Sequence, residues 1–168
     1  RVALDSDGAP LSEGVRGVPA LIKPNLWELS RLLAGRPLDS WNALARAARA
    51  VLDGGVGYLL VTLGEKGAIG FSREETVWWM PPPVKAISTV GCGDMFLAGF
   101  LHGFRGGSGF VRALGFGVAC GSAKAAVEGT GLPSRAAVRR VLALTRRVPS
   151  SSIPRTAERL LRRARSGG

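Results

Sequence analysis

The sequence predicts an α/β fold with a mostly parallel sheet and helices that cover it. Strand-like and helix-like segments alternate through residue 70, which is the pattern of parallel strands joined by helical crossovers. The 168 residues are 46% hydrophobic, with a mean hydropathy of +0.16. A chain of this length and apolarity can bury one real core, which excludes an intrinsically disordered protein.

The individual elements are predicted from short local patterns. We expect strands, as apolar runs bounded by turn residues, at residues 2–4, 20–23, 58–63, 68–71 and 76–80. We expect helices at residues 26–33, 41–52, 95–104, 110–127 and 134–145. Asn25 caps the first of these helices and Gly35 ends it. Residues 5–8 have the composition of a turn, and three prolines at 81–83 predict a stiff connector.

The net charge of +11 is concentrated at the C-terminal end. Residues 135–168 contain ten arginines and one acidic residue, Glu158, whereas residues 1–134 contain 13 basic and 11 acidic residues. We therefore expect a folded domain over residues 1–146 and a flexible, Arg-rich tail over residues 147–168, made of a linker and a loose basic helix. Specific nucleic-acid binding is the less favoured interpretation of such a tail.

The two cysteines favour a reducing, cytoplasmic location. Cys92 and Cys120 provide neither a disulfide framework nor a metal-ligand spacing, and both lie among apolar residues or glycines. The sequence has no signal-peptide pattern at its start. No apolar run is long enough to span a membrane, since Lys124 interrupts the best candidate.

Residues 88–100 carry the strongest chemical signal. A Gly-Cys-Gly turn at residues 91–93 opens an apolar helix, and Asp94 follows the turn. We expect the amides of residues 92–94 to point freely at the helix start, where the helix dipole adds positive charge and the backbone forms an anion pocket. An aspartate there can accept a proton from a hydroxyl that attacks a phosphoryl group. The alternative is an ordinary turn followed by a helix cap.

Two further segments directly follow predicted strands, where α/β sheets gather ligands. Lys23, Asn25 and Glu28 are suited to binding phosphate and positioning magnesium, although Asn25 and Glu28 also fit a variant of the capping box. The segment from Thr62 to Gly67 can hold a phosphate through backbone amides and a hydroxyl, although a hairpin turn explains the same residues.

In this order the motifs resemble the PfkB/ribokinase family of carbohydrate kinases. The resemblance covers about residues 2–145 and rests on Lys-Pro-Asn-x-x-Glu, [Ser/Thr]-Leu-Gly-x-x-Gly, Pro-Pro-Val-Lys-x-x-Ser-Thr-Val-Gly-x-Gly-Asp, Phe-Gly-Val-Ala-x-Gly-Ser and Gly-Thr-Gly-Leu-Pro. It is nearest to the sugar-phosphate kinases of that family, namely 1-phosphofructokinase, the minor 6-phosphofructokinase and tagatose-6-phosphate kinase. It implies a Rossmann-like, ribokinase-type fold, of which this chain matches the C-terminal half of a three-layer α/β/α sandwich.

The resemblance also implies roles for individual residues. Asp94 would be the catalytic base, and Gly91, Cys92 and Gly93 would form the anion hole for the transferring phosphoryl group. The residues implied in binding ATP and its Mg²⁺, with Glu28 serving the magnesium, are Lys23, Asn25, Glu28, Thr62, Gly64, Gly67, Val118 and Ser122. Some family members bind a monovalent cation such as K⁺, and the matching positions here are Ser88, Val90, Val127, Gly129 and Gly131.

The chain departs from the family pattern at several points. Cys92 replaces the usual Ala, Met95 replaces a usual Ser or Thr, and Lys124 replaces a small residue near the cation region, where its charge would disfavour a cation. Family members are considerably longer, and the half that carries their β lid and most sugar-binding residues has no counterpart here. His102, the one histidine, is expected to be structural.

We therefore expect a sugar-kinase half-domain that is inactive alone because it lacks an N-terminal half. The expected partners are ATP and a sugar phosphate, together with a second copy of the chain or a complementing subunit. The alternative is a non-catalytic remnant whose basic tail binds nucleic acid or another polyanion. Salt-dependent binding that is lost on deletion of residues 147–168 would favour that alternative.

Overall fold

The computed structural model describes residues 2–165, which form two compact units. The first unit comprises residues 1–62, 69–76 and 149–168, and the second comprises residues 63–68 and 77–148. The described residues contain six strands and seven α-helices, which confirms the predicted α/β class. No helix within residues 2–165 is long and apolar enough to cross a bilayer.

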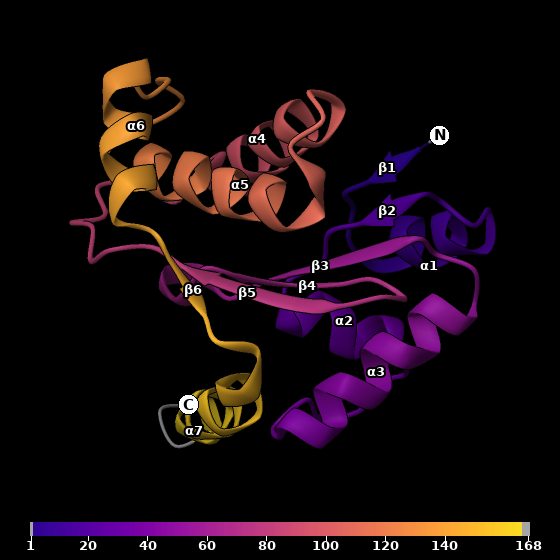
Figure 1. The fold of residues 1–168 in the computed structure, drawn as a ribbon. Coiled ribbons are helices and arrows are strands. Elements are labelled where there is room, and N and C mark those ends of the chain that lie inside the picture. The colour runs from indigo at the N-terminus through magenta and orange to yellow at the C-terminus, as the bar shows by residue number, and fades with distance from the viewer. Residues whose placement is uncertain (1, 166–168) are drawn as a thin grey trace. The chain divides into compact units, whose positions relative to one another are not determined.

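The first unit is built on parallel strands (Figure 1). Its strands and first helices are β1 (Ala3–Leu4), α1 (Gly8–Arg16), β2 (Leu21–Ile22), α2 (Leu26–Leu32), α3 (Trp41–Asp53) and β3 (Tyr58–Thr62). Leu21 of β2 is in register with Ala3 on one side and Tyr58 on the other. The interior of β3 is buried because its central residues are all apolar. The carboxyl ends of β2 and β3 therefore meet at one edge of the first unit.

Helix α1 was not predicted from the sequence. The turn expected at residues 5–8 is shorter in the structure, since the helix begins at Gly8 after the extended Asp7. Pro10 lies in the first helical turn, where its missing N–H leaves no bond unmade. Leu11 is the one buried side chain of this helix, so its sequence carries no clear apolar stripe.

The C-terminal segment also differs from expectation. Residues 153–165 form the helix α7, and its side chains Ile153, Ala157 and Leu161 are buried along one face in the first unit. The carboxylate of Glu158 accepts a hydrogen bond of 2.9 Å from the amide of Trp41, in the first turn of α3. The expected helix is present, but in residues 153–161 it is packed rather than loose. Residues 166–168 of the predicted tail lie outside the described residues.

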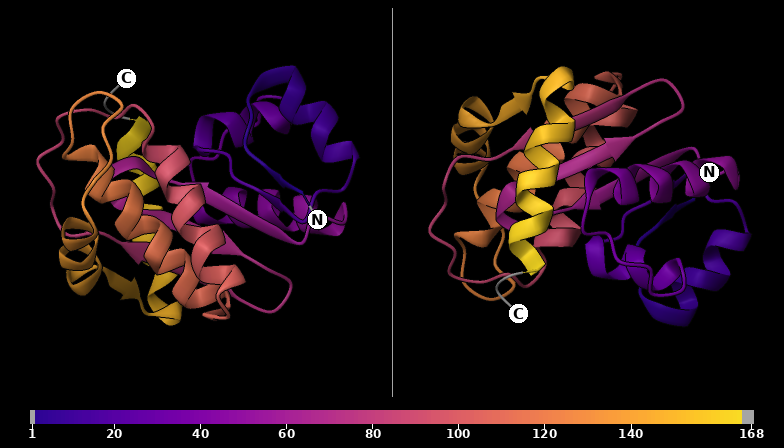
Figure 2. Two further views of the ribbon diagram at one scale, coloured as in Figure 1. Left: turned by 90° about the horizontal axis from the view of Figure 1, so that it is seen from above. Right: turned by 90° about the horizontal axis from the view of Figure 1, so that it is seen from below.

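The second unit contains an antiparallel strand pair and three helices. Its elements are β5 (Thr76–Met80), α4 (Cys92–Arg105), α5 (Gly109–Ala125), α6 (Arg135–Leu144) and β6 (Arg146–Val148). Thr76, the first residue of β5, is assigned to the first unit, and of β4 (Ala68–Phe71) only Ala68 is assigned to the second. Figure 2 shows α4 and α5 side by side. Glycines permit this close packing, since a Cβ on Gly117 would lie 2.9 Å from the carbonyl oxygen of Phe96. The start of α4 is thereby fixed against α5.

Candidate functional site

The N-terminus of α4 is the glycine turn for which the sequence predicts anion binding. Gly91 caps the helix with φ of +73°, a left-handed conformation that favours glycine. The first helical hydrogen bond runs from the amide of Met95 to the carbonyl of Gly91, at 2.9 Å. The amides of Gly93 and Asp94 therefore have no helical acceptor. The prediction of three free amides was wrong for Cys92, whose amide donates to the carbonyl of Thr89 at 3.2 Å.

Asp94 lies at the mouth of this turn and is exposed. Within the described part of the chain, no hydrogen bond or ion pair occupies its carboxylate. Its Oδ2 lies 3.9 Å from the position that a Cβ on Gly91 would take, so the carboxylate is near the turn it follows. This arrangement combines an accessible base with backbone donors, which is what phosphoryl transfer to a hydroxyl requires.

A second group of predicted residues lies at the carboxyl edge of the first unit. The amide of Thr62 donates to the carbonyl of Pro24 at 3.1 Å, and Thr62 forms an isolated parallel bridge with Asn25. Asn25 and Glu28 form the capping box: each backbone amide donates to the other's side chain, at 2.8 and 2.9 Å. The Asn25 side-chain amide also donates to Glu28 Oε1 at 2.8 Å.

Lys23 in this group has a partner that the sequence analysis missed. Its side chain is 6% exposed, and its Nζ lies 3.0 Å from Oδ1 of Asp5. Asp5 directly follows β1, just as Lys23 directly follows β2, and parallel neighbouring strands end at the same edge. The parallel pairing of β1 with β2 is the observation from which the contact between Lys23 and Asp5 could have been predicted.

Gly64 and Gly67 have different roles in the turn that follows Leu63. Gly64 begins the short 3-10 helix η1 (Gly64–Lys66) and Gly67 follows it. The turn is closed by a 2.8 Å hydrogen bond from the amide of Leu63 to the carbonyl of Gly67. Nothing lies within 4 Å of a Cβ on Gly64, so its backbone is open to a ligand. A Cβ on Gly67 would overlap the carbonyl oxygen of Trp79, so that glycine is needed for packing.

The end of α5 lies close to the start of α4. A Cβ on Gly121 would lie 3.0 Å from the carbonyl oxygen of Cys92, and the next residue, Ser122, is partly exposed. Val118 is buried, at 2% exposure, and presents little side-chain surface to a nucleotide. Lys124 is equally buried, and its Nζ donates to the carbonyl of Gly129 at 2.6 Å.

The positions expected to bind a monovalent cation are partly occupied by internal hydrogen bonds. The carbonyl of Gly129 accepts from the Lys124 ammonium, and the carbonyl of Ser88 accepts from the Cys92 thiol at 3.6 Å. The Lys124 ammonium, bonded to one of the expected ligands, disfavours the binding of a metal cation beside it, because the like charges repel. Residues 2–165 also contain no group of three His, Cys, Asp or Glu side chains that could hold a metal ion.

The two thiols have different environments. Burial raises the pKa of Cys120 to about 11. Burial also raises the pKa of Cys92, but the nearby Lys124 ammonium opposes that shift by stabilising the thiolate. Cys92 is partly exposed and Cys120 is buried.

We therefore expect iodoacetamide at mildly alkaline pH to alkylate Cys92 well before Cys120. Thiolate is the reacting form, and the higher pKa and burial of Cys120 both suppress it. Peptide mass spectrometry over time measures the two rates, and the urea-unfolded chain, in which both thiols are accessible, is the control. Equal rates in the folded chain would contradict the assigned environments.

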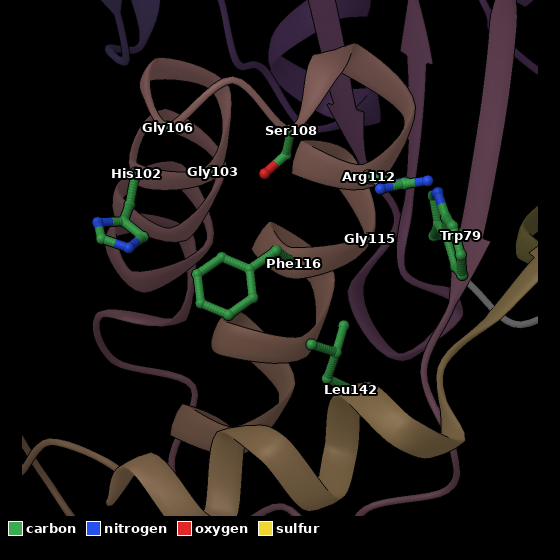
Figure 3. A pocket seen from close by; sticks show the side chains of 9 residues that line it. All are labelled: Trp79, His102, Gly103, Gly106, Ser108, Arg112, Gly115, Phe116 and Leu142. Carbon is green, nitrogen blue, oxygen red and sulfur yellow. The ribbon is translucent and has the colours of Figure 1, made fainter.

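A hollow in the second unit lies away from these residues. It has a volume of about 490 Å³, and Figure 3 shows its lining residues, Trp79, His102, Gly103, Gly106, Ser108, Arg112, Gly115, Phe116 and Leu142. It lies toward the C-terminal end of α4, and none of the predicted catalytic or nucleotide-binding residues lines it. His102 packs in it against Phe116, with ring centroids 5.9 Å apart.

Comparison with known proteins decides the family. The sequence pattern of the pfkB family carbohydrate kinases matches residues 1–137, most of the chain. The chain belongs to the pfkB family. The resemblance inferred from the motifs is thereby confirmed.

Two curated relatives and one solved structure place the chain within the pfkB family. It is 33% identical over 126 residues to the 1-phosphofructokinase of Borreliella burgdorferi, covering 74% of this chain and 41% of that protein. It is 36% identical over 136 residues to the ATP-dependent 6-phosphofructokinase isozyme 2 of Escherichia coli, covering 80% and 44%. The crystal structure of Escherichia coli phosphofructokinase-2 in complex with potassium aligns with a TM-score of 0.79 and 32% identity, over 85% of this chain and 47% of that one. The chain thus spans less than half the length of these pfkB proteins, and their solved structure confirms the ribokinase-type fold.

Proposed function

We propose that this chain supplies the nucleotide-binding half of an ATP-dependent sugar-phosphate kinase, which transfers a phosphoryl group to a hydroxyl of a phosphorylated ketohexose. The single observation that carries the proposal is the open turn at the start of α4, with an unoccupied Asp94 carboxylate at its mouth. The names of the relatives, 1-phosphofructokinase and ATP-dependent 6-phosphofructokinase, support the substrate class.

In this proposal the turn at the start of α4 supplies the catalytic base and the groups that stabilise the transition state. Asp94 accepts the proton of the attacking hydroxyl, so that the oxygen attacks as it loses its hydrogen. The amides of Gly93 and Asp94, together with the dipole of α4, stabilise the charge that develops on the transferring phosphoryl group. The open backbone at Gly64 is the proposed contact for the phosphates of ATP, which the glycine lets approach closely.

Glu28 fits a magnesium ion held through water. Each of its carboxylate oxygens accepts one hydrogen bond from Asn25, which leaves a second lone pair on each oxygen. Mg²⁺ keeps several of its waters in proteins, so these lone pairs suffice to hold a hydrated ion. When bound, the ion would neutralise charge on the ATP phosphates, while Asn25 orients the carboxylate.

The proposal includes the location and the assembly of the protein. A reducing cytoplasm suits the two free thiols, Cys92 and Cys120. Because the chain spans under half of its relatives' length, the sugar-binding part must come from a further segment, a partner subunit or a second copy.

We expect the 168-residue polypeptide to bind MgATP, with a dissociation constant no weaker than about 1 mM, and to turn over no fructose phosphate by itself. Isothermal titration with MgATP and a coupled ADP-release assay with fructose 1-phosphate or fructose 6-phosphate measure the two properties. Turnover by the polypeptide alone would contradict the half-site assignment. A folded chain that binds no MgATP would contradict the nucleotide-binding assignment.

A further inference from the structure

Lys124 is a buried charge without a buried counter-charge. Its side chain is 2% exposed, and none of the ion pairs among the described residues involves it. Its ammonium makes one hydrogen bond there, to the carbonyl oxygen of Gly129 at 2.6 Å. Burying an ammonium costs free energy unless neighbouring dipoles compensate for it, so a positive charge at this position needs an explanation.

The lysine lies where two loops meet the end of α5. Through Gly129 it holds the loop of residues 127–131, which follows α5. The next residue, Ala125, accepts hydrogen bonds from the amides of Ile87 and Ser88, at 2.7 and 3.2 Å. The Cε of Lys124 lies 3.5 Å from the position of a Cβ on Gly91, the residue that caps α4. One ammonium therefore lies between the loop after α5 and the turn before α4.

The acceptor of this ammonium is also a position at which the family resemblance implies a monovalent cation. A backbone carbonyl presents the same partial negative charge to an ammonium and to an alkali-metal ion, and both carry one positive charge. The carbonyl at Gly129 has the ammonium at 2.6 Å, so a separate cation beside it would meet a like charge.

We propose that the ammonium of Lys124 takes the place of a bound alkali-metal ion in this chain. The tethered charge holds the loop of residues 127–131 against the turn that opens α4, and this region therefore needs no potassium to be ordered. The inference concerns ion binding and stability, so it can be tested independently of phosphoryl transfer.

Thermal unfolding of the 168-residue chain in potassium chloride and in choline chloride, at equal ionic strength, tests the proposal. We expect the Tm of the original chain to agree in the two salts within about 1 °C, because no cation binds preferentially to the folded state. In Lys124→Met, which keeps an unbranched stem but removes the ammonium, we expect the Tm in choline to fall by roughly 5 °C. Potassium should then recover at least half of that loss, since the freed carbonyls can bind it.

The matched control is Lys85→Met, which removes an exposed lysine and should change neither the Tm nor its response to potassium. Lys124→Ala, which leaves more room for an ion, serves as the second variant. Recovery by potassium and not by choline in either variant supports the proposal, including the case in which the variant folds only in potassium. The proposal is overturned if potassium stabilises the original chain, or if neither variant responds to potassium, whether folded or unfolded.

Discussion

We expect replacement of Asp94 with asparagine to lower kcat by about 10²–10⁴-fold in a kinase in which this chain is completed by an N-terminal half. Asparagine has nearly the same size, and the Asp94 side chain makes no capping hydrogen bond that the change would remove, but an amide cannot accept the proton of the attacking hydroxyl. The backbone amides of Gly93 and Asp94 stay in place, because they depend on the left-handed turn at Gly91 and not on the side chain. The loss should therefore appear in kcat.

The dissociation constant for MgATP separates this role from a structural one. We expect it to stay the same or to decrease in Asp94→Asn, since a negative charge near the phosphates is removed. Asp53→Asn is the matched control, because Asp53 is exposed and pairs with Arg49 on the surface of α3. Retained kcat in Asp94→Asn would remove Asp94 from the catalytic role.

We expect replacement of Gly67 with alanine to destabilise the second unit strongly. The new Cβ would overlap the carbonyl oxygen of Trp79, which is backbone and cannot rotate away. The residue also has φ of +81°, which side chains avoid. Overpacking and backbone strain together should lower the free energy of unfolding by roughly 3–5 kcal/mol.

Gly64→Ala is the matched control in the same turn. It also has a positive φ, of +57°, but nothing lies within 4 Å of the added Cβ. Only the strain remains, so the free energy of unfolding should fall by roughly 1–2 kcal/mol. Urea unfolding monitored by tryptophan fluorescence measures both variants. Similar losses in the two would show that strain, and not the clash with Trp79, governs this turn.

The elements that could be predicted from the sequence are those with strong local patterns. The expected strands at 68–71 and 76–80 have the bounds of β4 and β5, because each is an apolar run between turn residues. The helix expected at 41–52 is α3 to within one residue, because its apolar positions repeat at helical spacing. The helix expected at 95–104 is α4, which begins three residues earlier, at Cys92, because the second half of the glycine turn is already helical.

The features that could not be predicted depend on distant contacts. Ile153, Ala157 and Leu161 are spaced for one helical face, but the arginines between them suggested a solvated helix. For Lys124 the sequence offered a position within a helix but not its acceptor, because the carbonyl of Gly129 is brought there by a loop. The same limit applies to Lys23, whose partner Asp5 follows another strand. The site residues assigned from the family resemblance remain predictions until they are measured.

The contact between Glu158 and the amide of Trp41 has a consequence for how the protein is made. The first unit draws on three separate stretches of the chain, and its last stretch, residues 149–168, is synthesised after the second unit. Residues 77–148 are synthesised earlier as one stretch, so the second unit can fold during synthesis. At that stage α3 does not yet have its contact with Glu158 of α7. Deleting residues 147–168 would likewise remove Val148, three buried residues of α7 and the carboxylate that caps α3. Such a deletion would measure assembly of the first unit and could not isolate polyanion binding by a tail.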